Sequence, residues 1–97
     1  MTTPKIIALA GSLRKDSFHQ KLINEAARFA LESGAEVEVI KLADLAIPMF
    51  DEDLEAQGTP AGVQQLKDKL RAADGILLAS PEYNGSITAV LKNAIDW

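Results

Sequence analysis

The stretch Ala10-Gly11-Ser12-Leu13-Arg14-Lys15-Asp16-Ser17 decides the fold, because it separates an apolar run from an amphipathic segment. Upstream, residues 6–9 (Ile-Ile-Ala-Leu) predict a short buried strand. Downstream, apolar side chains recur at the three-to-four spacing of one helix face, namely Phe18, Leu22, Ala26, Phe29 and Ala30. The stretch therefore predicts a loop that leaves the carboxyl end of a strand and opens a helix.

The side chains of this loop suit an anion. At such a junction, unpaired amide groups of the first helical turn point outward at the positive end of the helix dipole. Ser12 and Ser17 are hydroxyl donors, and Arg14 offers a planar fork of donors that matches phosphate oxygens. The single glycine, Gly11, permits a tight turn but excludes the dinucleotide fingerprint and the Walker loop. The loop fits a terminal phosphate monoester without metal, or else Ser17 merely caps the helix and Arg14 lies in solvent.

Composition bounds the class of protein. The 97 residues include 10 Lys and Arg against 14 Asp and Glu, for a formal net charge of −4. This length suffices for one compact domain, residues 1–97, and the acidic balance argues against nucleic acid or an anionic membrane as the main partner. The sequence has no cysteine, which excludes disulfides and thiolate metal sites. With neither a membrane-span pattern nor a signal-peptide pattern, we expect a cytoplasmic protein.

The first half of the chain predicts two strands around one helix. Residues 5–10 are apolar on both faces, as in a central parallel strand. The helix is expected over residues 17–33, and Gly34 suits the left-handed position just past its end. Residues 35–42 alternate polar and apolar for most of their length, which is typical of an edge strand.

A long connection, residues 43–59, follows this edge strand, with Pro48 and Gly58 as breakers. Its acidic residues are Asp51, Glu52, Asp53 and Glu55. They lack calcium-loop spacing, so we interpret them as solvated charge and helix capping rather than as a metal site. Connections of this length in small α/β domains often serve binding or dimer contacts.

The rest of the chain predicts another helix, a strand and a final helix. Thr59 is expected as the N-cap of the first of these helices, with Pro60 in its first turn. The buried stripe of that helix is expected to be Val63, Leu66, Leu70 and Ala73. Residues 76–80 predict a strand that is apolar on both faces, and the final helix is expected to begin near Ser86 or Ile87.

These elements predict a doubly wound parallel sheet of three layers, α/β/α, with strand order 2-1-3. Ligands in such sheets bind at the carboxyl ends of the strands, at the switch point between the first and third strands. The loops 11–17 and 81–86 both fall there. Their convergence favours a flat ligand that carries a phosphate.

The second loop, Pro81-Glu82-Tyr83-Asn84-Gly85, can offer backbone amides and one flat face to a heteroaromatic ring such as an isoalloxazine. Taken alone, its Pro, Asn and Gly are equally the residues usually found in a strand-to-helix turn. The two loops together, G-S-L-R-K-D-S and P-E-Y-N-G-S followed by L-K-N-A-I-D-W, resemble the NADPH-dependent FMN reductase family. That family has a flavodoxin-like fold and includes quinone, chromate and azo-dye reductases. The resemblance covers the entire chain in register.

This resemblance implies an enzyme that uses FMN, with NADPH or NADH as co-substrate. Hydride would pass to FMN N5 and then to a second acceptor in a ping-pong sequence, with no catalytic side chain and no metal. The acceptor would be a quinone, a flavin, a metal oxyanion or an azo compound. A homodimer or homotetramer is implied as the assembly.

The resemblance also implies the residues of the flavin site. The FMN phosphate would be held by Ser12, Arg14, Ser17, Phe18 and His19. The isoalloxazine would be lined by Pro81, Glu82, Tyr83, Asn84 and Gly85. A structural role is expected for Lys92, Asn93, Asp96 and Trp97. The sequence departs from the family at His19, where Asn is frequent, and at residues 88–89, where Thr-Ala replaces a frequent Pro-Gly.

Length is the larger departure. The complete family fold has the strand order 2-1-3-4-5, so we expect this chain to be truncated after the third strand and helix. Residues 76–79 would then offer an unpaired apolar edge to another chain. Two alternatives to a reductase are a non-catalytic electron carrier of the flavodoxin type and a truncated module that cannot bind flavin alone.

Overall fold

The computed structural model describes residues 3–12, 18–81 and 86–97. Three strands form one parallel sheet in the order β2-β1-β3. The strands are β1 (Lys5–Ala10), β2 (Glu36–Ile40) and β3 (Gly75–Ala79). The helices of the described residues are α1 (Phe18–Glu32), α2 (Leu42–Leu45), α3 (Glu52–Ala56), α4 (Ala61–Arg71) and α5 (Ala89–Asp96). The predicted parallel sheet and its strand order are confirmed.

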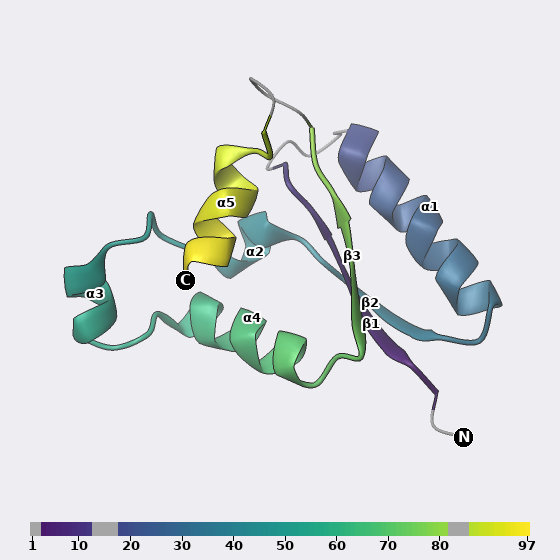
Figure 1. Ribbon diagram of the computed structural model, residues 1–97, viewed down its shortest axis with the longest axis horizontal. Helices are drawn as coiled ribbons and strands as arrows, with labels where there is room; N and C mark the ends of the chain where they lie inside the picture. The colour runs from purple at the N-terminus through teal and green to yellow at the C-terminus, as the bar shows by residue number, and fades with distance from the viewer. Residues whose placement is uncertain (1–2, 13–17, 82–85) are drawn as a thin grey trace.

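The sheet lies between two helical layers (Figure 1). Helix α1 covers one face, while α2, α4 and α5 lie on the other face, and α3 stands away from the sheet. The central strand β1 sends Ile7 and Leu9 into the core on the side of α2 and α4. It sends Ala8 and Ala10 into the core on the α1 side. A strand that is apolar on both faces is therefore buried on both, as predicted.

The predicted buried face of α1 is wrong. Its buried residues are Gln20, Ile23 and Ala27, whereas Phe18 is 84% exposed and both Leu22 and Phe29 lie mostly in solvent. The helix is apolar over a broad arc, so the spacing alone fits two neighbouring faces. Packing selects the face, because the small Ala8 and Ala10 of the sheet leave room for Ile23 and Ala27 to approach closely.

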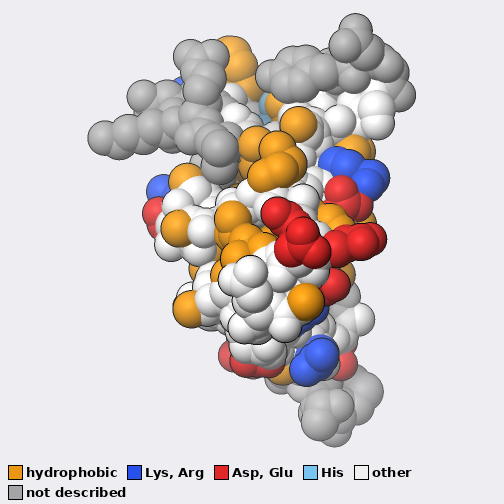
Figure 2. Space-filling model, turned by 90° about the vertical axis from the view of Figure 1, so that its left-hand side faces the viewer, with side chains coloured by type: hydrophobic (Ala, Val, Ile, Leu, Met, Phe, Trp, Pro, Cys, Tyr) orange, Lys and Arg blue, Asp and Glu red, His pale blue; other side chains and the backbone are white. Residues whose placement is uncertain are grey.

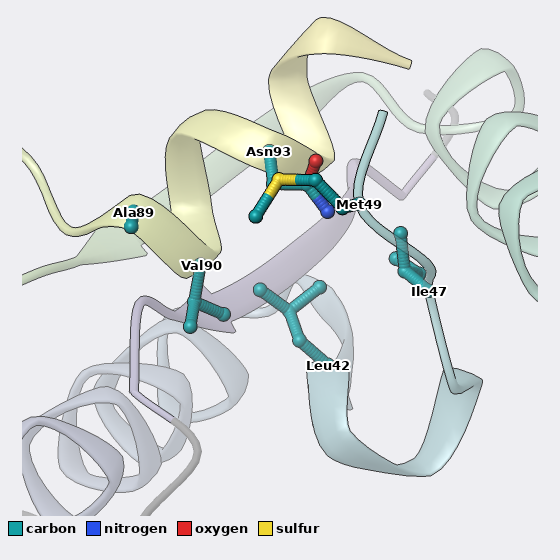
Figure 3. A pocket seen from close by; sticks show the side chains of 6 residues that line it. All are labelled: Leu42, Ile47, Met49, Ala89, Val90 and Asn93. Carbon is teal, nitrogen blue, oxygen red and sulfur yellow. The ribbon is translucent and has the colours of Figure 1, made fainter. Parts of the chain in front are cut away.

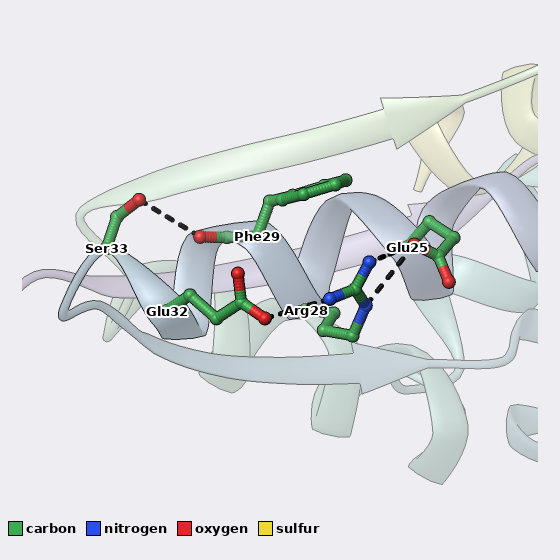
Figure 4. Close-up of polar contacts among 5 residues, drawn as sticks. All are labelled: Glu25, Arg28, Phe29, Glu32 and Ser33. Carbon is green, nitrogen blue, oxygen red and sulfur yellow. Dashed lines mark hydrogen bonds and ion pairs between the residues drawn. The ribbon is translucent and has the colours of Figure 1, made fainter.

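The outer surface of α1 carries an ion-pair network around Arg28 (Figure 4). The Arg28 guanidinium donates to carboxylates one turn on either side, Glu25 and Glu32, each at 2.8 Å. The hydrogen bond and the charge of Glu25 raise the pKa of Arg28 above its ordinary value. The helix ends as predicted, since Gly34 has a φ of 98°. Because the network is exposed to solvent, we assign it no role in a binding site.

The connection after β2 contains two short helices, α2 and α3, where the sequence predicts irregular chain. Asp51 is the N-cap of α3, and its side chain accepts a hydrogen bond from the Asp53 amide at 2.8 Å. Capping thus accounts for one member of the acidic cluster, as interpreted from the sequence. Within the described ranges, no group of three or more His, Asp or Glu residues could hold a metal ion.

Helix α4 begins at Ala61, one residue after a proline. Pro60 is the N-cap residue in an extended conformation and makes no side-chain capping bond, so the prediction of Thr59 as N-cap is wrong. Val63 and Leu66 are buried as predicted. At Gly62 an added Cβ would lie 1.8 Å from the Leu45 carbonyl oxygen. This glycine therefore lets α4 lie directly against the end of α2.

Helix α5 begins at Ala89, later than the predicted start near Ser86 or Ile87. The reason is that Thr88 is extended, with φ −67° and ψ 155°, and its side chain accepts a hydrogen bond from the Leu91 amide. None of the helices in the described parts of the chain has both the length and the apolar character needed to cross a membrane.

Candidate functional site

The carboxyl ends of β1 and β3 lie next to each other in register. Ala10 pairs with Ala79, and the Gly11 amide donates to the Ala79 carbonyl oxygen at 2.7 Å. The loop after β1 and the loop after β3 therefore start from neighbouring points at the carboxyl end of the sheet, beside the start of α1 (Figure 1). This is the switch point at which sheets of this topology bind ligands.

Gly11 is buried in a space that admits no side chain. A Cβ at this position would lie 2.9 Å from Thr88 Oγ1, 3.0 Å from Ser80 Oγ and 3.1 Å from Leu91 Cβ. The φ of Gly11 is not positive. The glycine is thus explained by the close approach of Thr88 and Ser80, not by a left-handed turn.

Two hydroxyl groups connect the loops at this point. Thr88 Oγ1 donates to the Gly11 carbonyl oxygen at 2.7 Å, and the Thr88 amide donates to Ser80 Oγ at 3.3 Å. Ser80 Oγ in turn donates to the Pro81 carbonyl oxygen at 3.0 Å. The sequence interpretation missed both Ser80 and Thr88 as members of the site. Its one signal was the departure of residues 88–89 from the family pattern.

The structure places part of the predicted flavin site. Ser12 and Pro81 are half-buried, and each lies two residues after the end of its strand, β1 or β3. Phe18 and His19 lie in the first turn of α1, with Phe18 largely in solvent and His19 half-buried. The remaining predicted residues lie outside the described residues; they are Arg14, Ser17, Glu82, Tyr83, Asn84 and Gly85.

Helix α5 is tied to the connection after β2. The Asn93 side chain donates to the Pro48 carbonyl oxygen at 2.8 Å and accepts from the Phe50 amide at 2.6 Å. Trp97 Nε1 donates to the same Pro48 oxygen at 2.9 Å, and its ring meets Phe50 edge-on. Lys92 and Asp96 form an ion pair one turn apart. These contacts are structural, which agrees with the role expected for this segment.

Where α5 contacts the connection after β2, the two segments also form a pocket of about 210 Å³ that the sequence does not predict (Figure 3). Its lining residues are Leu42, Ile47, Met49, Ala89, Val90 and Asn93. Figure 2 faces this side of the molecule, where hydrophobic side chains lie beside the acidic ones. The lining holds no titratable group, so the pocket can take an apolar group but supplies no proton. Its one sequence signal was the unusual length of the connection.

The described residues fit a flat, phosphate-bearing cofactor at the switch point. Helix α1 has 15 residues, and the amino end of such a helix carries the positive end of the helix dipole, which suits a phosphate. Gly11 lets the segments that follow β1 and β3 pack closely, because its amide bonds to the Ala79 carbonyl and no Cβ would fit beside Thr88 and Ser80. The second loop leaves β3 beside it, which places a second set of loop groups at the same edge.

Comparisons with known proteins identify the family of this chain. The family described as NADPH-dependent FMN reductase matches residues 4–97. An NADPH:quinone oxidoreductase of Arabidopsis thaliana is 47% identical over 96 residues, which are 96% of this chain and 48% of that protein. An NAD(P)H-dependent FMN reductase of Pseudomonas aeruginosa is 43% identical over 94 residues, 96% of this chain and 49% of that protein.

Solved structures give the same result. The flavoenzyme NAD(P)H:(acceptor) oxidoreductase FerB of Paracoccus denitrificans superposes with a TM-score of 0.81 at 36% identity. The match covers 98% of this chain and 50% of FerB. The flavodoxin-like fold expected from the sequence is thus confirmed. The chain spans about half the length of the curated relatives that it matches.

Proposed function

Because this chain belongs to the NADPH-dependent FMN reductase family, we propose that it supplies the FMN-binding part of an NAD(P)H-dependent oxidoreductase acting on a quinone-type acceptor. Relatives that carry the names FMN reductase and quinone oxidoreductase support the cofactor and the acceptor class. Bound FMN would supply the redox chemistry, with its N5 as the hydride acceptor for NAD(P)H and the reduced flavin as the donor to the second acceptor in a ping-pong sequence.

One observation carries the proposal. The two loops with cofactor-binding chemistry leave the adjacent ends of β1 and β3, beside the amino end of α1. A ligand with a phosphate at one end and a ring at the other can reach both loops at once.

We assign the phosphate to the first loop and the ring to the second. Ser12 and Ser17 would donate hydroxyl hydrogen bonds, Arg14 would pair with the phosphate charge, and the turn at residues 18–19 would offer backbone groups. Residues 81–85 would bind the edge and one face of the isoalloxazine. The chain's own work is therefore binding and orientation, since hydride transfer needs no side-chain acid or base.

The first test is the visible spectrum of the purified chain after incubation with FMN and gel filtration. A retained flavin band that NADPH bleaches and benzoquinone restores is the expected result. A retained band that NADPH leaves unchanged would indicate an electron carrier instead. A colourless chain would contradict the assignment of a sufficient flavin site to residues 1–97.

The second test is Arg14→Ala, because one hydrogen-bonded charge on the phosphate is at stake. We expect FMN affinity to fall by about 1.5 to 3 kcal/mol, the range for a hydrogen bond to a charged group. Arg28→Ala is the matched control, since the contacts described for this arginine, with Glu25, Glu32 and the Phe29 ring, all lie within α1. Titration of flavin fluorescence measures both variants, and unchanged affinity in Arg14→Ala would refute the phosphate assignment.

A further inference from the structure

Thr88 is the most buried polar side chain at the carboxyl end of the sheet, where the two loops begin. It is 4% exposed, and its hydroxyl is both donor and acceptor. It donates to the Gly11 carbonyl oxygen at 2.7 Å and accepts from the Leu91 amide at 3.3 Å. A buried hydroxyl with both functions satisfied is costly to replace, because each lost bond leaves a buried partner unpaired.

Three segments meet at this residue. The hydroxyl connects α5 to the chain leaving β1, and the Thr88 amide connects it to Ser80, which follows β3. The Ser80 hydroxyl in turn donates a hydrogen bond to the carbonyl oxygen of Pro81, the first residue of the second loop. One residue therefore joins the start of the phosphate loop to the start of the ring loop.

In the described part of the chain, the sheet also joins the segments that lead into the two loops. The strand pairing ends with Ala10 opposite Ala79, and one further backbone bond, from the Gly11 amide to the Ala79 carbonyl, extends it. The packing around Gly11 is close, because no Cβ would fit between Thr88 and Ser80. Within the described residues, the Thr88 contacts therefore act together with the Gly11–Ala79 bond in setting the separation of the two loop starts.

We propose that Thr88 is a positioning residue that fixes the distance between the phosphate loop and the ring loop, a role that rests on the proposed FMN function. FMN spans both loops, so it binds best when their separation is already correct. A ligand that engages two sites at once loses this advantage when the sites move independently. Riboflavin lacks the phosphate and engages only the ring loop, so its affinity depends much less on the separation.

The experiment compares FMN and riboflavin binding to the purified chain and to two variants at position 88. Thr88→Val keeps the shape and removes the hydroxyl, while Thr88→Ser keeps the hydroxyl. In Thr88→Val we expect FMN to bind about tenfold more weakly and riboflavin to change by less than about threefold, as for loss of one bridging hydrogen bond. Thr88→Ser should restore the ratio of the two affinities.

A control variant separates positioning from loss of stability. Val63→Ala removes a buried group of α4, away from both loops, and destabilises the fold through packing. It should leave the FMN-to-riboflavin ratio unchanged. Equal weakening of both flavins in Thr88→Val, an equal change of the ratio in Val63→Ala, or no restoration by Thr88→Ser would overturn the proposal.

Hydrogen exchange of the chain without flavin keeps the positioning role separate from the proposed function. The Gly11 amide should exchange faster in Thr88→Val than in the parent chain, Thr88→Ser or Val63→Ala. Unchanged exchange at Gly11 would overturn the role of Thr88 even if FMN binds. Faster exchange in a chain that binds no FMN would instead refute the proposed function and leave the structural linkage standing.

Discussion

The two edges of the sheet differ in what they offer to a neighbour. The outer strand β2 has polar residues at alternate positions, Glu36 and Glu38, and Glu38 forms an ion pair with Lys69 of α4. The strand β3 carries no charged side chain, yet Ile76 and Leu78 are 51% and 54% exposed. Charge on a short strand protects an edge, whereas an exposed apolar edge invites pairing. The composition of β2 is that of an outer strand, and the composition of β3 is that of an inner one.

A shallow apolar groove of about 100 Å³ borders β3. Its lining residues are Leu9, Leu66, Leu70, Ile76, Leu78, Leu91, Ala94 and Ile95. Helices α4 and α5 thus cover this side of β3 only in part, and β1 is the one strand that pairs with β3 in the described sheet. We therefore expect the chain to associate with another chain through β3, which agrees with the homo-oligomer expected from the sequence.

The largest effect should come from placing a charge on this edge. Leu78→Lys would put an ammonium group where an apolar contact forms, so we expect self-association to weaken roughly a hundredfold, as for loss of one buried leucine contact. Light scattering over a range of protein concentrations measures the dissociation constant. Val39→Lys is the matched control, because it adds the same charge to the opposite edge, where Val39 is 37% exposed.

If Val39→Lys dissociates the assembly as much as Leu78→Lys does, the contrast between the edges fails. If the parent chain is a monomer at every concentration, the apolar edge does not drive association.

A medium effect should come from the helix pair beside the β2 edge. Gly62→Ala improves helix propensity by roughly 1 kcal/mol but drives a methyl group into the Leu45 carbonyl oxygen. We expect a net loss of about 1 to 3 kcal/mol in the free energy of unfolding, as for other overpacked sites. Urea unfolding measures it. Gln65→Ala, at an exposed position of the same helix, should change stability little, and a stabilised Gly62→Ala would refute the close contact of α4 with α2.

The smallest effect should come from the ion pair that borders β2. Glu38→Gln removes the carboxylate partner of Lys69, and both side chains are partly exposed, so about 0.2 to 1 kcal/mol of stability should be lost. Thermal unfolding at low and high salt measures the change, which should shrink as salt screens the pair. Glu36→Gln on the same strand, with no ion pair among the described contacts, is the control. An effect that persists at high salt would argue against an electrostatic origin.

The sequence predicted an element correctly where the environment is uniform along that element. Residues 6–10 are apolar at every position, as expected of a strand that is covered on both faces. The alternation near residues 36–40 likewise marks an outer strand. From these two strands and the helices between them, the order β2-β1-β3 and the switch point follow.

The same reasoning failed where several neighbours compete for one element. The buried face of α1 was misassigned because its apolar side chains spread over two faces, and the helix packs on the small residues of β1 through Ile23 and Ala27. The starts of α4 and α5 were misplaced because extended conformations at Pro60 and Thr88 delay the first turn. Local pattern identifies an element, but its boundary depends on the conformation of single residues.

The sequence by itself determined the order of the three strands and of helices α1, α4 and α5, the central position of β1, and the start of both loops at the switch point. Only the tertiary structure decided that Gly11 is enclosed by Thr88 and Ser80, and that Asn93 and Trp97 hold Pro48. These contacts join residues 43 to 77 positions apart. Periodicity reports on neighbours along one helix or strand, whereas contacts of this kind arise only after the sheet has brought distant segments together.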